Sequence, residues 1–110
     1  METQTYAELV KQMKKVPVFE SRIDQNDLKE FVVKEENITP LHMIFQKYFQ
    51  EFKSPSEIPT LEDKRRTARW GGIREHQALY FKEEKGFSHC AMIWPWEDGT
   101  RCTVKVVRWQ

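Results

Sequence analysis

The fold of this chain is decided by its C-terminal stretch, residues 74–109, which reads REHQALYFKEEKGFSHCAMIWPWEDGTRCTVKVVRW. Aromatic and β-branched residues gather there in three runs, and Lys85-Gly86 and Asp98-Gly99 separate the runs with residue pairs typical of tight turns. We therefore predict an antiparallel meander with strands at 74–83, 87–94 and 101–109.

The second turn also predicts which residues lie opposite one another. If it is centred on Asp98-Gly99, then Ile93 faces Val104 and Ala91 faces Val106, so these four share one face of the sheet. The other face then holds a mixed set, namely Met92, Trp94, Thr103, Lys105 and Val107. Its mixed chemistry predicts partial exposure.

The N-terminal part of the chain begins with a helix signal. Thr5 is the expected N-cap, Glu8 completes a capping box, and Tyr6, Leu9, Val10 and Met13 are spaced to share one face. The helix should end by Val16, because Pro17 cannot continue it. Residues 16–22 are expected to be extended, and the proline restricts them to the edge of a sheet.

Two further segments are short. Residues 28–33 fit a helix through Leu28, Phe31 and Val32, although Phe31-Val32-Val33 also fits the core of a strand, and we expect the helix. Residues 61–69 should form a helix capped by Thr60, with Asp63 in the capping-box position, and Gly71-Gly72 should end it.

The strongest helix signal is at residues 40–53. Thr39 is the expected N-cap, Pro40 suits the first helical position, and an apolar stripe follows: Leu41, Ile44, Phe45, Tyr48, Phe49 and Phe52. We therefore expect an α+β fold in which two to four N-terminal helices pack on a C-terminal antiparallel sheet of three strands, or four with an edge strand.

Composition is typical of a folded domain with a solvated surface. Of 110 residues, 39% are apolar, 13% aromatic and 32% charged, and the mean hydropathy is −0.74. Membrane-length apolar runs and signal-peptide features are lacking, and two cysteines do not make a disulfide framework. We expect residues 1–110 to form a single domain located in the cytoplasm.

Charge is uneven along the chain. Residues 1–63 carry eight Lys or Arg against twelve Asp or Glu, whereas residues 64–110 carry ten against five. The candidate nucleic-acid-binding residues lie in the basic segment KRRTARWGGIR at 64–74: Lys64, Arg65, Arg66, Arg69, Trp70 and Arg74. The competing interpretation, which we favour, is a solvated helix face with Trp70 packed into the core.

The tryptophans, at positions 70, 94, 96 and 109, all lie in the C-terminal part of the chain. Two of them flank Pro95 at the second turn, next to two acids, so the candidate partner-binding residues are Trp94, Trp96, Glu97 and Asp98. Such a tip suits a contact on a protein partner or a small cage for a cation. Alternatively, one indole fills the core while the other covers a strand end.

Metal and disulfide sites are not expected. His89 and Cys90 are adjacent and should point to opposite faces of a strand, while His76 lies elsewhere, so no zinc-type spacing results. The register places Cys102 opposite Pro95, too far from Cys90 for a disulfide, and both should be buried thiols. His42 should lie on the surface of its helix, and no cofactor is expected.

Three functions follow from these patterns. We favour a small non-enzymatic binding protein, of the inhibitor, accessory or adaptor type, that docks on a protein partner through an aromatic sheet face and the hairpin tip. The first alternative is nucleic-acid binding through residues 64–74, with the third helix on DNA and the hairpin as a wing. The second is an RNA-cleaving enzyme that uses Glu75, His76 and Tyr80 with the basic residues of 64–74. The expected architecture is similar to that of the ribosome-dependent RNA-cleaving toxins of bacteria, but none of their motifs is present.

Overall fold

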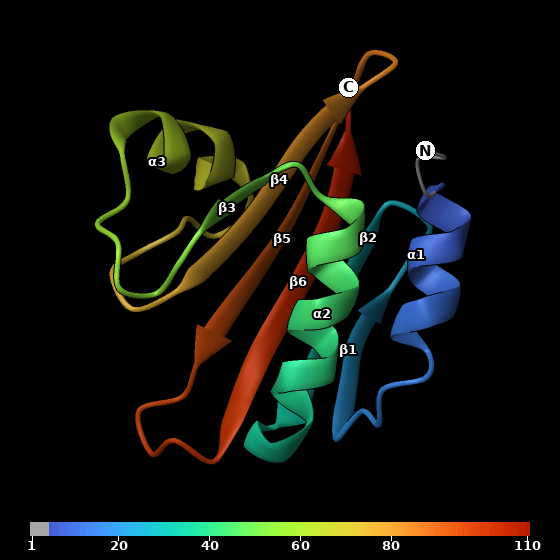
Figure 1. Cartoon of the computed structure of the whole chain (residues 1–110), viewed down its shortest axis with the longest axis vertical. Helices are drawn as coiled ribbons and strands as arrows, with labels where there is room; N and C mark the ends of the chain where they lie inside the picture. The colour runs from blue at the N-terminus through green and yellow to red at the C-terminus, as the bar shows by residue number, and fades with distance from the viewer. Residues whose placement is uncertain (1–4) are drawn as a thin grey trace.

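The computed structural model describes residues 5–110, and over that range it shows helices interleaved with the strands of one six-stranded antiparallel sheet (Figure 1). The strand order is β1-β2-β6-β5-β4-β3. The elements are α1 (Tyr6–Met13), β1 (Glu20–Asp24), β2 (Leu28–Lys34), the 3-10 turn η1 (Glu35–Asn37), α2 (Ile38–Tyr48), β3 (Glu51–Lys53), α3 (Leu61–Thr67), η2 (Ala68–Trp70), β4 (Ala78–Glu84), β5 (Phe87–Pro95) and β6 (Arg101–Trp109).

The C-terminal meander is confirmed. Strands β4, β5 and β6 pair in sequence, and Ile93 lies opposite Val104 while Ala91 lies opposite Val106. Lys85 and Gly86 both have positive φ, 52° and 83°, as the two central residues of a type I′ hairpin turn require. The first strand begins at Ala78 rather than at residue 74, because residues 74–77 form the loop that enters it.

The helix predicted at 28–33 is wrong, because these residues form β2. Phe31, Val32 and Val33 are all buried, although Val32 points to the opposite face of the sheet from the other two. It pairs along its whole length with β6, where Phe31 lies opposite Val104. The expected arrangement of N-terminal helices on a three-stranded sheet is therefore also wrong: β1, β2 and β3 come from the first half of the chain and extend the sheet on both sides.

The bounds of α2 differ from those predicted at both ends. It begins at Ile38 after Asn37, so Thr39 is not the N-cap and Pro40 lies within the first turn, where a missing amide N–H costs no helical hydrogen bond. It ends at Tyr48, because Phe49 is extended, and Phe52 belongs to β3 rather than to the helix. The edge strand expected at 16–22 is β1, which lies at the sheet edge but begins at Glu20.

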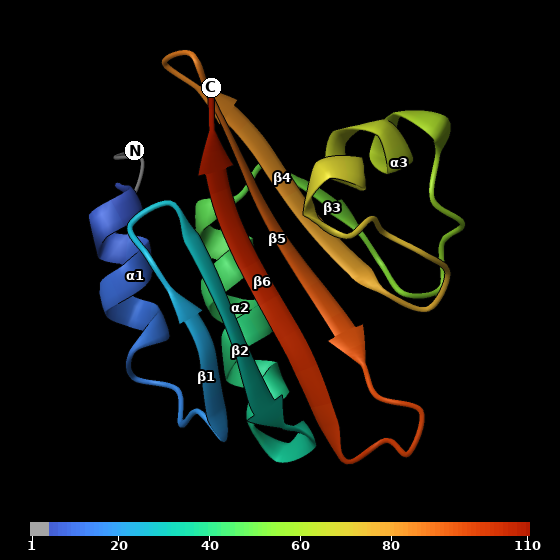
Figure 2. The ribbon, with the colours of Figure 1, turned by 180° about the vertical axis from the view of Figure 1, so that it is seen from behind.

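Two apolar layers hold the sheet. On one face, α1 and α2 cover it and contribute Leu9, Leu41 and Phe45 to the larger core. On the other face, a smaller cluster forms around Phe81 and Met92, with Trp70, Trp94 and Trp109 packed against it. Figure 2 shows α3 near β3 and β4 at one side of this second face, while β6, β2 and β1 have no helix in front of them.

The predicted caps of α1 and α3 are confirmed in outline. The Thr5 hydroxyl accepts a hydrogen bond from the Glu8 amide, and Thr60 with Asp63 makes a reciprocal capping box. Gly71 then reverses the chain with a φ of +107°. A Cβ at this position would lie 3.1 Å from Cη2 of Trp94, so the glycine also makes room for an indole.

Candidate binding surface

The hairpin tip between β5 and β6 is a tightly bonded turn. The Trp96 amide donates to the Arg101 carbonyl at 2.9 Å, and the Gly99 amide donates to the Trp96 carbonyl at 3.0 Å. The Asp98 carboxylate accepts from both the amide and the hydroxyl of Thr100, which lowers the pKa of Asp98. These bonds hold the tip in one conformation without help from a ligand.

Trp96 is fixed by its polar atom. Its indole Nε1 donates to the Thr103 hydroxyl on β6 at 2.9 Å, and the side chain remains partly exposed. A partly exposed indole that is already oriented loses little conformational freedom when a partner covers it. Such a residue is well suited to a contact surface.

Arg101, the first residue of β6, lies between two aromatic rings. Its guanidinium carbon is 4.0 Å from the centre of the Phe19 ring and 5.4 Å from the centre of the Trp96 ring. No carboxylate within residues 5–110 lies within 4.0 Å of it. We call Phe19, Trp96 and Arg101 the Arg101 stack. Phe19 is 48% exposed, so the stack is open to solvent.

The sheet surface beside the stack carries charges that neutralise one another. Arg22 pairs with Glu20 at 2.7 Å and reaches Glu30 at 3.8 Å, and Glu30 in turn pairs with Lys105 at 3.3 Å. The Lys105 ammonium also donates to the Trp70 carbonyl at 3.1 Å. Across this half of the second face, the cations without an acidic partner among the described residues are therefore Arg101 and Lys34, which lies opposite it on β2.

The structure separates the two tryptophans of the predicted tip. Trp94 packs under Gly71 and beside Lys105, against the smaller core, whereas Trp96 belongs to the surface stack. Glu97 and Asp98 are exposed at the turn. Phe19 was not among the predicted site residues, because it follows Val16-Pro17-Val18 and nothing in that apolar run marks its ring as exposed.

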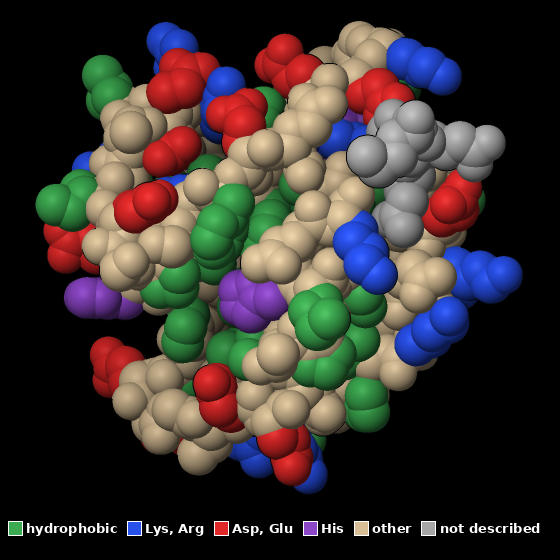
Figure 3. Space-filling model, viewed as in Figure 1, with side chains coloured by type: hydrophobic (Ala, Val, Ile, Leu, Met, Phe, Trp, Pro, Cys, Tyr) green, Lys and Arg blue, Asp and Glu red, His purple; other side chains and the backbone are tan. Residues whose placement is uncertain are grey.

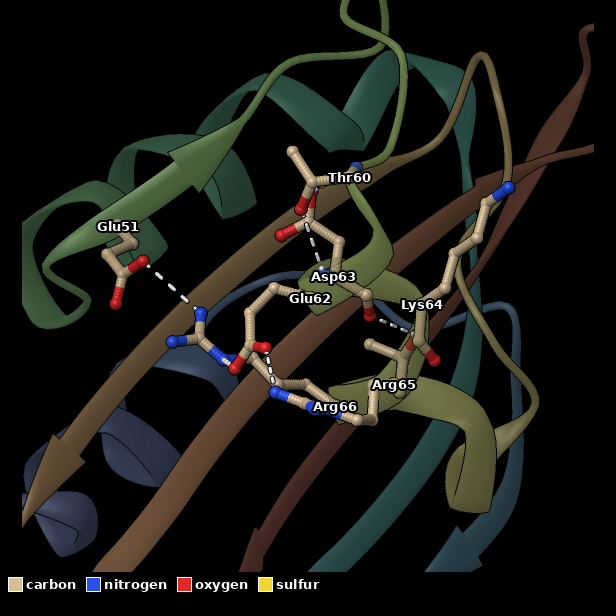
Figure 4. Close-up of polar contacts among 8 residues, drawn as sticks. Glu51, Thr60, Glu62, Asp63, Lys64, Arg65 and Arg66 are labelled. Atoms are coloured by element: carbon tan, nitrogen blue, oxygen red, sulfur yellow. Dashed lines mark hydrogen bonds and ion pairs between the residues drawn. The ribbon is translucent and has the colours of Figure 1, made fainter.

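The basic segment is largely occupied by contacts within the protein, as Figure 4 shows. Arg66 pairs with Glu51 of β3 at 3.3 Å and with Glu62 at 3.2 Å, and it lies 3.9 Å from the centre of the Phe81 ring. Arg65 also pairs with Glu62, whereas Lys64 extends away from these acids. Arg69 lies over the ring of Trp70 at 4.7 Å, and Arg74 is exposed in the loop before β4.

The proposed acid-base set is not brought together. Tyr80 is buried under α2, where its hydroxyl bonds to Nδ1 of His42 at 2.7 Å, while Glu75 and His76 are exposed in the loop before β4. His42 is therefore half-buried and bonded rather than a free surface histidine, and burial lowers its pKa.

A second buried polar cluster lies where the end of α2 meets the sheet. The Tyr48 hydroxyl contacts Nδ1 of His89 at 2.9 Å, and the ammonium of fully buried Lys82 lies 3.6 Å from the centre of the Tyr48 ring. Lys82 also forms an ion pair with Glu84 at 3.0 Å. Burial, with the charges of Lys82 and Arg108, lowers the pKa of His89.

The cysteines are free and buried, as expected, with Cys90 in the smaller core and Cys102 in the larger one on the opposite face. Burial raises the pKa of both thiols, that of Cys102 to about 12. Across residues 5–110, no group of three or more His, Cys, Asp and Glu side chains is arranged to hold a metal ion. In the same range, no helix has the length and apolar character needed to cross a membrane.

Comparison of the chain with known protein families, curated proteins and solved structures finds no match.

Proposed function

We propose that this chain is a non-enzymatic binding protein that docks on a protein partner through the Arg101 stack and the adjoining hairpin tip. The observation that carries the proposal is the guanidinium of Arg101, held between two exposed or partly exposed rings with no carboxylate partner among the described residues. Tryptophan and arginine are the residues most often responsible for binding energy at protein interfaces.

The stack has the rigidity that a contact surface needs. The Trp96 indole is anchored by Thr103, the tip is closed by its own backbone bonds, and Arg101 is supported by Phe19 on its other side. A surface ordered before binding avoids the entropy cost of freezing side chains at the moment of association.

The chemistry of Arg101 indicates what the partner presents. A planar guanidinium supported by aromatic rings keeps its N–H groups in one plane, which matches the two oxygens of a carboxylate. We therefore expect an Asp or Glu of the partner at Arg101, with an apolar or aromatic side chain against Trp96 and Phe19.

The test is affinity capture from extract of the cells that produce the protein, with bound protein and nucleic acid both analysed. Wild type is compared with Trp96→Ala, with Arg101→Gln, and with a charge-reversal control, Lys64→Glu/Arg69→Glu/Arg74→Glu. Circular dichroism and urea unfolding first establish that each variant folds.

We expect one protein to be retained by wild type and by the charge-reversal control, and lost with Trp96→Ala and Arg101→Gln. Its retention should change little between about 50 mM and 200 mM salt, whereas a protein held by roughly six to ten phosphate contacts loses about 10³–10⁵ in affinity over that range. Recovery of nucleic acid that disappears in the charge-reversal control would instead support binding through residues 64–74. Equal recovery by wild type and both stack variants would refute the proposal.

A further inference from the structure

A groove between α1 and α2, on the helix-covered side of the sheet, is not used by the Arg101 stack. Its volume is about 380 Å³, and its lining includes Lys15, Val16 and Pro17 from the segment that follows α1 and Met43 and Lys47 from α2. Figure 3 shows apolar side chains gathered in this region, with Lys side chains beside them toward α1.

The α2 wall of the groove is a helical stripe. Pro40, Met43, Ile44 and Lys47 recur at intervals of three, four and seven residues, so they lie along one outward side of α2. Val16 is buried and forms part of the floor, whereas Met43 is 56% exposed although it is large and apolar. A flexible thioether in that position can adapt to an apolar side chain of a partner.

The rim of the groove is positive. Lys15 and Lys47 line it, and Lys11 lies in α1, four residues before Lys15 in the sequence. None of the three has a carboxylate within 4.0 Å in residues 5–110, and no Asp or Glu lines the groove. An occupant with acids on its flanks would gain attraction there that a neutral or basic segment would not.

We propose that the α1–α2 groove binds an acidic amphipathic helix of a partner protein. Two helices lying on a sheet offer a seam into which the apolar ridge of a third helix can pack. The α2 wall from Pro40 to Lys47 is about 10 Å long at 1.5 Å per residue, which matches roughly two turns of the incoming helix. The apolar side of the incoming helix contacts Met43 and Val16, and the acidic side chains of that helix lie against Lys15 and Lys47.

The probe is a display library of short helical peptides with a fixed apolar stripe at i, i+3, i+4 and i+7 and randomised flanking positions, selected on immobilised wild-type protein. We expect the selected peptides to be enriched in Asp and Glu beside the stripe. Synthetic copies should bind Lys15→Glu/Lys47→Glu at least tenfold more weakly than wild type. The matched control, Lys64→Glu/Arg74→Glu, carries the same charge change at exposed positions away from the groove and should bind as wild type does.

Selection of neutral or basic peptides, or of none, would overturn the proposal. Equal binding by the groove variant and wild type would do the same. Two assays test the other occupants of the groove: sedimentation with phosphatidylserine vesicles tests a membrane surface, and analytical ultracentrifugation tests a second copy of the chain. If no peptide binds, vesicle binding that is lost with Lys15→Glu/Lys47→Glu would assign the groove to a membrane surface. Dimer formation that is lost with the same variant would assign it to a second copy. The Trp96→Ala variant should bind the peptides normally, which separates this test from that of the Arg101 stack.

Discussion

Replacing Gly71 by alanine tests the packing of Trp94, on which the separation of the two hairpin tryptophans depends. Gly71 has a φ of +107°, and an added Cβ would lie 3.1 Å from Cη2 and 3.4 Å from Cζ2 of the indole. The backbone conformation alone costs a residue with a Cβ about 1–2 kcal/mol. Crowding of a half-buried ring adds about 1 kcal/mol, at the low end for overpacking, because the indole can shift toward solvent. We expect Gly71→Ala to lower the free energy of unfolding by about 2–3 kcal/mol.

The neighbouring glycine supplies the control. Gly72 also has positive φ, +78°, but a Cβ there would meet nothing within 4 Å. Gly72→Ala should therefore cost only the backbone part, about 1–2 kcal/mol. Both variants are measured by urea unfolding, followed by tryptophan fluorescence and by far-UV circular dichroism, and then repeated in a Trp94→Phe background, which lacks the outer ring of the indole.

In that background the difference between the two alanine variants should shrink to less than about 0.5 kcal/mol, the range within which independent effects add. If Gly71→Ala and Gly72→Ala cost the same with Trp94 in place, the indole does not lie under Gly71. Trp94 would then be as available for contacts as Trp96, and the division of the tip into a core residue and a surface residue would be refuted.

Four other outcomes follow from the structure. Burial lowers the pKa of both His42 and His89, so the unfolded chain takes up protons near pH 6.5 that the folded protein does not, and the urea concentration at the unfolding midpoint should be lower at pH 5 than at pH 7. His89→Gln should reduce this pH dependence, and a midpoint that does not change with pH would contradict the prediction. Lys82→Met should leave the free energy of unfolding unchanged or raise it by about 1 kcal/mol, because it removes a fully buried ammonium and leaves Glu84 partly solvated. A decrease of more than about 1 kcal/mol in the free energy of unfolding, measured with urea, would show that the ion pair is stabilising. Thr103→Val should lower the free energy of unfolding by about 1 kcal/mol, because it removes the hydrogen-bond acceptor of the Trp96 indole. It should weaken capture of the partner less than Trp96→Ala does. If both variants capture the partner as well as wild type, the Arg101 stack is not the contact surface. The thiols of Cys90 and Cys102 should react with a thiol reagent only at the rate of unfolding at pH 8, and fast labelling in native buffer would contradict their burial.

The parts of the fold that could be predicted from the sequence are those with local signals. Lys85-Gly86 and Asp98-Gly99 specify their turns by conformational preference, and once a turn is fixed, so is the register of the strands beside it. Thr60 and Asp63 cap α3 with side chains three residues apart. Each of these features is decided within a few residues.

The errors have a common physical origin in contacts between distant segments. Phe31-Val32-Val33 is buried on both faces and so shows no alternation, and only pairing with β6 makes it a strand. Phe52 continues the apolar stripe of α2 in phase, but pairing with β4 places it in β3, where its ring stacks on Tyr80. The Arg101 stack likewise joins residue 19 to residues 96 and 101, and nothing in either segment alone indicates the other.

The central position of β6 bears on how the molecule opens. One of its edges pairs with β2, where Leu28 lies opposite Val107, and the other pairs with β5. Detaching β6 would leave a β1–β2 hairpin and a β3–β4–β5 ribbon with no backbone hydrogen bonds between them. The sheet therefore cannot open at its middle without coming apart as a whole. The amide hydrogens of β6 should therefore exchange with solvent only when the whole protein unfolds, while those of β1 and β3 at the two edges exchange through cheaper local fluctuations.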